Sequence, residues 1–167
     1  MREQSSLSRL LCAPTRAGRL GWIGVRPERR APVVEVTEVE LVAGRGITGD
    51  HYRGRPNGGR QVTLFAREHL SAIASYLGEP EIAPSRLRRN LLVEGINLLA
   101  LKGRQFRVGS ALLEWSGECH PCSRMEEEFG TGGYNAVRQH GGITARVLEG
   151  GIVRIGDVVA CSATADS

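Results

Sequence analysis

The chain has 167 residues and carries 22 Lys and Arg against 18 Asp and Glu, a formal net charge of +4 with neutral His. This length suits a single domain with a buried core of ordinary size. Apolar residues make up 41% of the chain and charged residues 24%, a balance that excludes a wholly disordered protein. Charges interrupt every apolar stretch, so we expect no membrane-spanning helix and no membrane partner.

Positive charge is concentrated near the N-terminus. Residues 1–30 hold seven Arg and two Glu, a balance of +5, which leaves −1 for residues 31–167. Aromatic residues are only 5% of the chain, whereas a nucleic-acid-binding domain combines a basic face with interleaved aromatic residues. We therefore do not expect nucleic acid as a partner. We expect a basic, flexible N-terminal arm over residues 1–18, a single domain over 19–161 and a tail over 162–167.

Four cysteines, at positions 12, 119, 122 and 161, are too few and too irregularly spaced for a disulfide scaffold. The N-terminal segment lacks the long apolar region of a secretory signal. We therefore expect reduced thiols and a cytoplasmic location.

Short segments rich in β-branched residues, separated by the 22 Gly and 7 Pro of the chain, predict strands. The predicted strands span residues 20–25, 33–42, 61–65, 91–93, 105–108, 111–115, 143–148, 152–153 and 158–161. Gly109-Ser110 and Gly150-Gly151 are two-residue turn signals. Each predicts a hairpin between the strands on either side of it.

One segment has a clear helical period. Leu70, Ile73, Ala74 and Leu77 recur at the spacing of one helix face, and Gly78 marks the end of the helix. Residues 85–89, 123–129 and 134–139 are predicted to add single turns or short helices. One clear helix among so many strands predicts a mainly β (α+β) domain, closed or sandwiched, rather than alternating strand–helix units.

The sequence Cys119-His-Pro-Cys122 follows the predicted strand that ends at Trp115. A structural zinc site needs four ligands, and no second pair of this spacing occurs. A thioredoxin-like dithiol belongs early in a strand–helix–strand fold, whereas this pair is late in a β-rich chain. A single reactive thiolate that accepts sulfur or binds a soft metal is the third interpretation. An inert, buried cysteine pair is the fourth.

Two further motifs carry polar groups suited to a site. The glycine-rich segment 44–51 ends in Asp50 and His51, a carboxylate and an imidazole, and it lacks the Lys of a nucleotide P-loop. Arg88, Arg89 and Asn90 lie in an arginine cluster before an apolar run. Guanidinium groups hold phosphate well, although clustered arginines also occur on solvated surfaces.

The order of these motifs resembles that of the MOSC domain family, named for the C-terminal domain of molybdenum cofactor sulfurases. The resemblance covers roughly residues 20–160. Its segments are Gly-x-Gly-Ile-x-Gly-Asp-His at 44–51, Arg-Gln-Val-Thr-Leu at 60–64, Arg-x-Asn-Leu at 88–91, Gly-x-Cys-x-Pro-Cys at 117–122, Gly-Gly-Ile-x-Ala-Arg-Val at 141–147 and Gly-Gly-Ile-Val-x-Ile-Gly-Asp-x-Val at 150–159.

The resemblance implies a closed or half-open β-barrel-like domain whose pocket handles molybdopterin-bound molybdenum or its sulfur. Cys122 matches the position of the family's sulfur carrier or molybdenum ligand, with Cys119 as its neighbour. Arg88 and Asn90 match an Arg-x-Asn element that would contact the pterin phosphate or the metal site, and Arg60 would help to hold the phosphate. Between them stands Arg89, where larger cofactor-binding relatives carry Pro.

Two chemistries fit this resemblance. In one, the Cys122 thiolate carries sulfur or ligates molybdenum while the domain delivers or hosts the cofactor. In the other, the bound cofactor reduces small N-hydroxylated substrates. The chain has no cysteine set for an iron–sulfur cluster and no dinucleotide fingerprint, so a separate partner protein would supply the electrons. Asp50 and His51 are the candidate pair for proton transfer.

Two rivals lie outside molybdenum chemistry. One is a cofactor-free dithiol redox protein in which Cys119 and Cys122 are equally important. The other is a non-catalytic binding module that recruits a partner through the basic residues 1–30.

Overall fold

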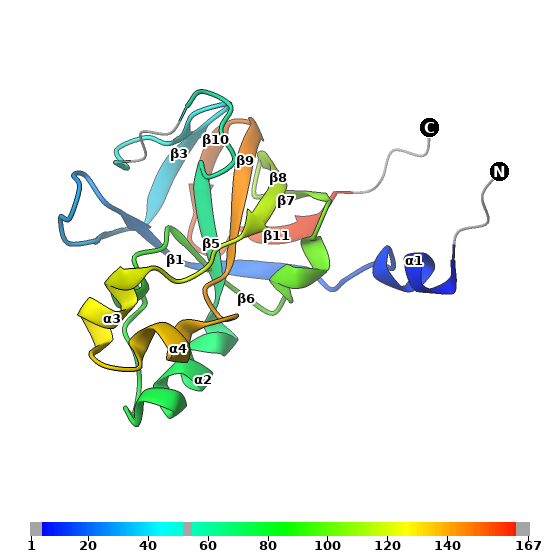
Figure 1. Cartoon of the computed structure of the whole chain (residues 1–167). Helices are drawn as coiled ribbons and strands as arrows, with labels where there is room; N and C mark the ends of the chain where they lie inside the picture. The colour runs from blue at the N-terminus through cyan, green and yellow to red at the C-terminus, as the bar shows by residue number, and fades with distance from the viewer. Residues whose placement is uncertain (1–4, 52–54, 163–167) are drawn as a thin grey trace.

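The computed structural model describes residues 5–51 and 55–162. Its centre is a closed β-barrel of seven strands (Figure 1). In order around the ring these are β11 (Val158–Cys161), β7 (Gln105–Val108), β8 (Ala111–Glu118), β9 (Ile143–Glu149), β5 (Val62–Ala66), β6 (Leu91–Glu94) and β1 (Gly18–Val25). Pairing of β1 with β11 closes the ring, and β2 (Val34–Val36) extends from β1. The predicted mainly β, closed-barrel class is confirmed.

Strand pairing is antiparallel except between β5 and β6, which are parallel. All five residues of β5 are buried, because one face of this strand fronts the barrel interior and the other lies under helices. The interior core includes Leu64, Leu91 and Phe106. A second core includes Phe65 and Leu92 and packs the outer face of the barrel against helices.

A small sheet of β10 (Gly151–Arg154), β3 (Glu38–Val42) and β4 (Gly46–Ile47) lies at one end of the barrel. The pairing of this small sheet contradicts two predictions from the sequence. The strand predicted over 33–42 is interrupted at Thr37, so that β2 and β3 belong to different sheets. The hairpin predicted at Gly150-Gly151 is also wrong, because β9 pairs with β5 and β8 whereas β10 pairs with β3.

Close backbone packing explains why no hairpin forms at Gly150-Gly151. A side chain at Gly150 would meet the carbonyl oxygen of Leu41, so glycine allows the chain to leave one sheet and enter the other at this point. The hairpin predicted at Gly109-Ser110 is confirmed, with Val108 opposite Ala111.

The predicted long helix is α2 (Arg67–Leu77), which buries Leu70, Ile73 and Ala74 and ends at Gly78 with φ 68°. Short helices occur at the three other predicted places: η1 (Pro84–Leu87), α3 (Ser123–Phe129) and α4 (Gly133–Val137). Helices α2, α3 and α4 gather at one side of the barrel (Figure 1). No helix in the part of the chain that the structure describes is long and apolar enough to cross a bilayer.

Two helices and one strand were not predicted. Helix α1 (Ser6–Leu11) lies in the predicted N-terminal arm, projects from the barrel and buries none of its residues. The turn η2 (Leu98–Leu101) begins where the Asn97 side chain accepts a hydrogen bond from the Leu99 N–H. Both are too short to show a helical period, and β4 has only two residues.

The loop that carries Cys119 is attached to the barrel through Gly142. The Cys119 N–H donates to the Gly142 carbonyl oxygen at 2.8 Å. Gly142 has φ 87°, and a side chain there would collide with the Leu64 carbonyl oxygen of β5. The glycine therefore lets the end of the cysteine loop lie directly against β5.

We predict that Gly142→Ala lowers the free energy of unfolding by about 3 kcal/mol, from left-handed strain plus the collision with β5. Gly78→Ala is the matched control, because Gly78 is left-handed, with φ 68° and ψ 24°, and has open space around it. It should cost only about 1 kcal/mol. Urea denaturation of both variants measures the difference, and equal losses would contradict the close-packing argument.

Candidate functional site

A cavity of about 600 Å³ opens beside the barrel, between the loop after β1, the start of β5, the segment between η1 and β6, and the start of α3. Its lining is strongly basic, with two carboxylates, Glu28 and Glu127, against seven arginines. The arginines are Arg26, Arg29, Arg30, Arg60, Arg88, Arg89 and Arg124. The cavity also reaches His51, Gln61, Thr63, Asn90 and Cys122. Most of the predicted site residues therefore share one cavity.

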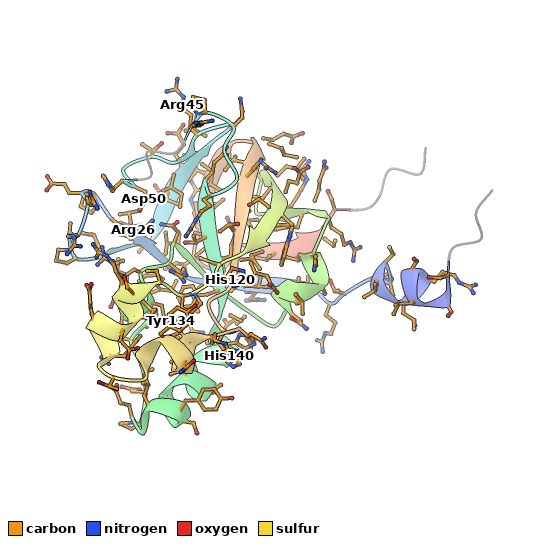
Figure 2. All side chains as sticks on the ribbon, in the orientation of Figure 1. Arg26, Arg45, Asp50, His120, Tyr134 and His140 are labelled. Atoms are coloured by element: carbon orange, nitrogen blue, oxygen red, sulfur yellow. The ribbon has the colours of Figure 1, made fainter. Side chains whose placement is uncertain are left out.

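Asp50 neutralises the charge of one of these arginines, Arg26, in an ion pair. Its carboxylate accepts from Arg26 Nη2 at 3.2 Å and from the Arg26 backbone N–H at 2.8 Å, and its side chain is 1% exposed. Figure 2 shows Arg26 and Asp50 together near one end of the barrel. Among residues 5–51 and 55–162, none of the other six arginines of the cavity forms an ion pair. The cavity therefore has an uncompensated positive charge.

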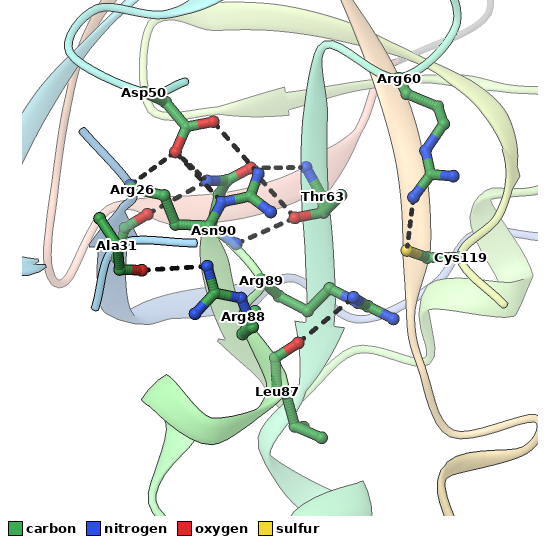
Figure 3. Close-up of polar contacts among 11 residues, drawn as sticks. Arg26, Ala31, Asp50, Arg60, Thr63, Leu87, Arg88, Arg89, Asn90 and Cys119 are labelled. Atoms are coloured by element: carbon green, nitrogen blue, oxygen red, sulfur yellow. Dashed lines mark hydrogen bonds and ion pairs between the residues drawn. The ribbon is translucent and has the colours of Figure 1, made fainter. Parts of the chain in front are cut away.

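Asn90 connects the cavity to the barrel. Its Oδ1 accepts from the Thr63 N–H and hydroxyl at 3.2 and 3.0 Å, and its Nδ2 donates to Gly24 O and Asp50 Oδ1, each at 3.2 Å (Figure 3). The side chain is buried, with an exposed fraction of 1% for the residue. These bonds join β1 and β5 to the residue directly before β6, so the carboxamide is committed to holding the framework together.

Arg88 is held in an unusual backbone conformation, with φ 57°. Its Nη2 donates to Ala31 O at 3.0 Å. Burial lowers the pKa of Arg88, and the nearby cations Arg124 and Arg26 lower it further. Left-handed non-glycine residues are uncommon and concentrate at functional sites. Arg88 is therefore a charged group held in place at a cost in free energy.

Arg89 is more deeply buried, with 7% of its surface exposed. Its Nη1 donates to Leu87 O at 3.2 Å (Figure 3). Its Nε donates to Gly141 O at 2.9 Å. Burial lowers the pKa of Arg89, while the Cys119 thiol acts in the opposite direction. An arginine remains protonated at neutral pH, so an anion in the cavity would relieve the cost of this buried charge.

The two cysteines of the predicted pair have different surroundings. Cys122 is exposed and lines the arginine cavity just before α3. Cys119 is 3% exposed, receives a weak hydrogen bond from Arg60 Nη2 at 3.8 Å and lines a second cavity. Only Cys122 thus presents its thiol to a ligand in the arginine cavity.

His51 also lines the arginine cavity. The Asp50 carboxylate contacts Arg26 and Asn90, and the described contacts include none between that carboxylate and the His51 ring. In the described contacts, the Asp50 carboxylate therefore does not orient the His51 imidazole.

The second cavity, of about 660 Å³, lies on the other side of the cysteine loop and contains three histidines that no sequence pattern connected. Figure 2 shows His120, Tyr134 and His140 near the helices. His69 and His140 meet edge to face, with ring centroids 4.8 Å apart. Burial lowers the pKa of His69, and a charge on His140 lowers it further, against a smaller opposite effect of Glu68. In the described ranges, no three His, Cys, Asp or Glu side chains are arranged to hold a metal ion.

We predict that Asn90→Ala lowers the free energy of unfolding by about 3 kcal/mol, because several buried partners lose their hydrogen bonds together. Asn135→Ala, at an exposed asparagine, is the control and should change it by less than about 0.5 kcal/mol. Chemical denaturation measures both. A loss at Asn90 no larger than at the control would show that the network does not hold the strands.

We also predict that acid destabilises the protein through His69. Because folding lowers the pKa of His69, the unfolded chain binds more protons just below about pH 6.5, and the free energy of unfolding falls as the pH falls through that region. His69→Gln should make this decline shallower. Melting temperatures between about pH 7.5 and pH 5.5 test the prediction, and an unchanged slope in the variant would refute it.

The comparisons with known proteins agree with this architecture. The family model of the MOSC domain matches residues 31–160. The solved structure of the YuaD protein from Bacillus subtilis has a TM-score of 0.75 at 20% identity, covering 87% of this chain and 96% of that one.

Two YiiM structures are also similar. YiiM from Escherichia coli has a TM-score of 0.67 at 21% identity, covering 89% of this chain and 72% of that one. YiiM from Geobacillus stearothermophilus has a TM-score of 0.68 at 17% identity, covering 90% and 77% respectively. The search of curated proteins returned no match. These structures share the fold, and the family model spans most of the chain, so this protein belongs to the MOSC domain family.

Proposed function

We propose that the arginine cavity binds a molybdopterin-type cofactor and that the Cys122 thiolate ligates its molybdenum or carries its sulfur. One observation carries this proposal: an exposed thiol opens into the same cavity as seven arginines, of which only Arg26 is ion-paired within the described residues. The MOSC family, which is associated with this cofactor in general, supplies the second argument.

The residues present fit such a group. Thiolate is a suitable ligand for a soft, sulfur-binding metal. Guanidinium groups bind phosphate through paired, charge-assisted hydrogen bonds. Arg60, Arg88 and Arg89 are the candidates for that contact, since none forms an ion pair in the described part of the chain. Asn90 supports the cofactor indirectly, by fixing Asp50 and the adjacent strands.

The reaction we propose is the reduction of an N-hydroxylated small molecule. One N–O bond breaks, two electrons and two protons are taken up, and the products are the amine-type compound and water. The bound metal supplies two-electron chemistry, and a separate electron-donor protein supplies the electrons. His51 lies at the cavity and is the candidate group to deliver a proton.

Sulfur delivery is the variant of this proposal in which the cofactor is not retained. In that version the Cys122 thiolate would accept a sulfane sulfur from a persulfide on a separate donor protein, whose own cysteine leaves as a thiolate. A thiol reductant would then release this sulfur from Cys122 as sulfide to a cofactor in the same cavity and would itself end as a disulfide with Cys122. A cytoplasmic location fits both versions, because the four cysteines are all free and reducing conditions preserve the thiols.

The unequal cysteines make the two molybdenum versions preferable to a cofactor-free dithiol protein. Cys119 is buried against Arg60, whereas Cys122 is exposed, so an incoming disulfide or thiol substrate would reach only one sulfur directly. The binding-module alternative depends on residues 1–30, which contribute Arg26, Arg29 and Arg30 to the cavity wall. These three arginines therefore contribute positive charge to the cavity, whether or not residues 1–30 also recruit a partner.

The test is the molybdenum and pterin content of protein purified from a host that makes the cofactor. Cys122→Ser should lose at least about nine-tenths of the bound molybdenum, because it replaces the thiolate with a poor ligand for a soft metal. Cys12→Ser, at an exposed cysteine outside the cavity, is the matched control and should retain it. Cys119→Ser should retain more of the metal than Cys122→Ser.

Two outcomes would contradict the proposal. Equal loss in the Cys119 and Cys122 variants would favour a dithiol function. Absence of both molybdenum and pterin from every preparation would remove the cofactor-hosting version and leave transient sulfur transfer to be tested by persulfide trapping on Cys122.

A further inference from the structure

The second cavity differs from the arginine cavity in its charge. Its volume is about 660 Å³, which is within the range of small-molecule sites. Among the described residues that line it, one is a carboxylate, Glu118, and one is an arginine, Arg138, so these formal charges cancel. In the described ranges the two cavities share no lining residue. A molecule without net charge therefore suits the second cavity, whereas an anion suits the first.

Apolar and aromatic side chains form much of the wall of this cavity. Leu98 and Ile143 are buried there, Trp115 is half-buried, and Tyr134 is exposed. Aromatic rings pack favourably against one another, offset or edge to face, and small-molecule sites are lined mainly by such groups. An aromatic ligand would remove this apolar surface from water. The composition of the wall therefore favours an aromatic ligand.

His69 presents an uncharged ring to this cavity. The ring meets that of His140 edge to face, and its Nδ1 is buried without a hydrogen-bond partner among the residues that the structure describes. Protonation would make both ring nitrogens donors and would leave a buried N–H without an acceptor. Burial accordingly lowers the pKa of His69, and a charge on His140 lowers it further, against a smaller opposite effect of Glu68. The His69 ring is therefore neutral at pH 7 and adds no charge to the wall.

The turn before His140 keeps a side chain in the wall at a position where glycine would be less strained. Gln139 follows the last residue of the α4 C-cap, Arg138, and has φ 66°. Glycine is the usual residue at this left-handed position after a helix, because a Cβ is unfavourable there. Gln139 nevertheless lines the second cavity. Backbone strain of this kind concentrates at ligand-binding sites, so the turn is an independent indication of one.

We propose that the second cavity binds an uncharged aromatic small molecule, whose ring packs among Trp115, Tyr134 and His140. This site goes beyond the proposed function, because it requires neither molybdenum nor Cys122. Its ligand should therefore bind equally well to protein from hosts that make the molybdenum cofactor and from hosts that do not. Failure of the cofactor proposal would leave this site intact, and failure of this site would leave the cofactor proposal intact.

Three molecules of similar size separate the required properties of the ligand. Benzamide is uncharged and aromatic, cyclohexanecarboxamide is uncharged but not aromatic, and benzoate is aromatic but anionic. In nitrogen–proton NMR spectra of the full-length protein, benzamide should shift the indole N–H resonance of Trp115. The resonance of Trp22, which lies in the core between the barrel and the helices, should stay in place. The other two molecules should bind at Trp115 at least about threefold more weakly, because one lacks ring–ring packing and the other carries a charge that the lining does not match.

Tyr134→Ala removes one ring from the site. It should weaken benzamide binding about threefold to tenfold, which is the factor expected for one aromatic pair. Tyr76→Ala is the matched control. Tyr76 is also exposed and also contacts the His140 ring, with centroids 5.6 Å apart, but it does not line the cavity and its loss should leave the affinity unchanged.

Four results would overturn the proposal. They are a Trp115 resonance that ignores benzamide, equal affinity for benzamide and cyclohexanecarboxamide, equal or tighter binding of benzoate at Trp115, and a Tyr134→Ala variant with wild-type affinity. The wild-type titrations decide the matter even if the variant does not fold. Benzamide binding that occurs only in cofactor-loaded protein would also contradict a separate site, because it would make the second cavity part of the cofactor site.

Discussion

Partly buried arginine charge without matching carboxylates is the constraint on which the cavity depends. Removing a guanidinium from water costs free energy, and proteins normally offset the cost with a paired carboxylate. Here Arg26 has Asp50, whereas Arg88 and Arg89 rely on backbone carbonyl groups within the described structure. A cavity built in this way is less stable empty than filled with an anion. An anionic cofactor would therefore contribute to the stability of the fold as well as to its chemistry.

The barrel keeps these charges in place through a small number of connections. Asn90 joins three strands and holds Asp50, which in turn holds Arg26 at the cavity edge. Gly142 brings the cysteine loop against β5. Strands from distant parts of the sequence thereby bring the arginines and Cys122 together around one space. Figure 3 shows Arg26, Arg60, Arg88 and Arg89 among them. Rigid strands supply the framework, and the loops between them supply the charged groups.

Much of the architecture could be predicted from the sequence, because local pattern determines it. The helical period of α2 and the Gly109-Ser110 turn were sufficient to place those elements. The path at Gly150 could not be predicted, since glycine at that position permits a close approach to Leu41 that only the folded chain reveals. Motif order named most of the residues that the fold brings to the arginine cavity, but it did not show their contacts. The commitment of Asn90 to the framework and the meeting of His69 with His140 depend on partners remote in sequence.

X-ray absorption at the molybdenum edge of purified protein tests the central claim most directly, because it reports the atoms bound to the metal. The account predicts a molybdenum signal that includes a sulfur ligand from the protein, and it predicts that this ligand disappears in residual metal bound by Cys122→Ser. A wild-type spectrum identical to that of the variant, or wild-type protein without a molybdenum edge when prepared in a cofactor-producing host, would contradict a Cys122-ligated cofactor in the arginine cavity.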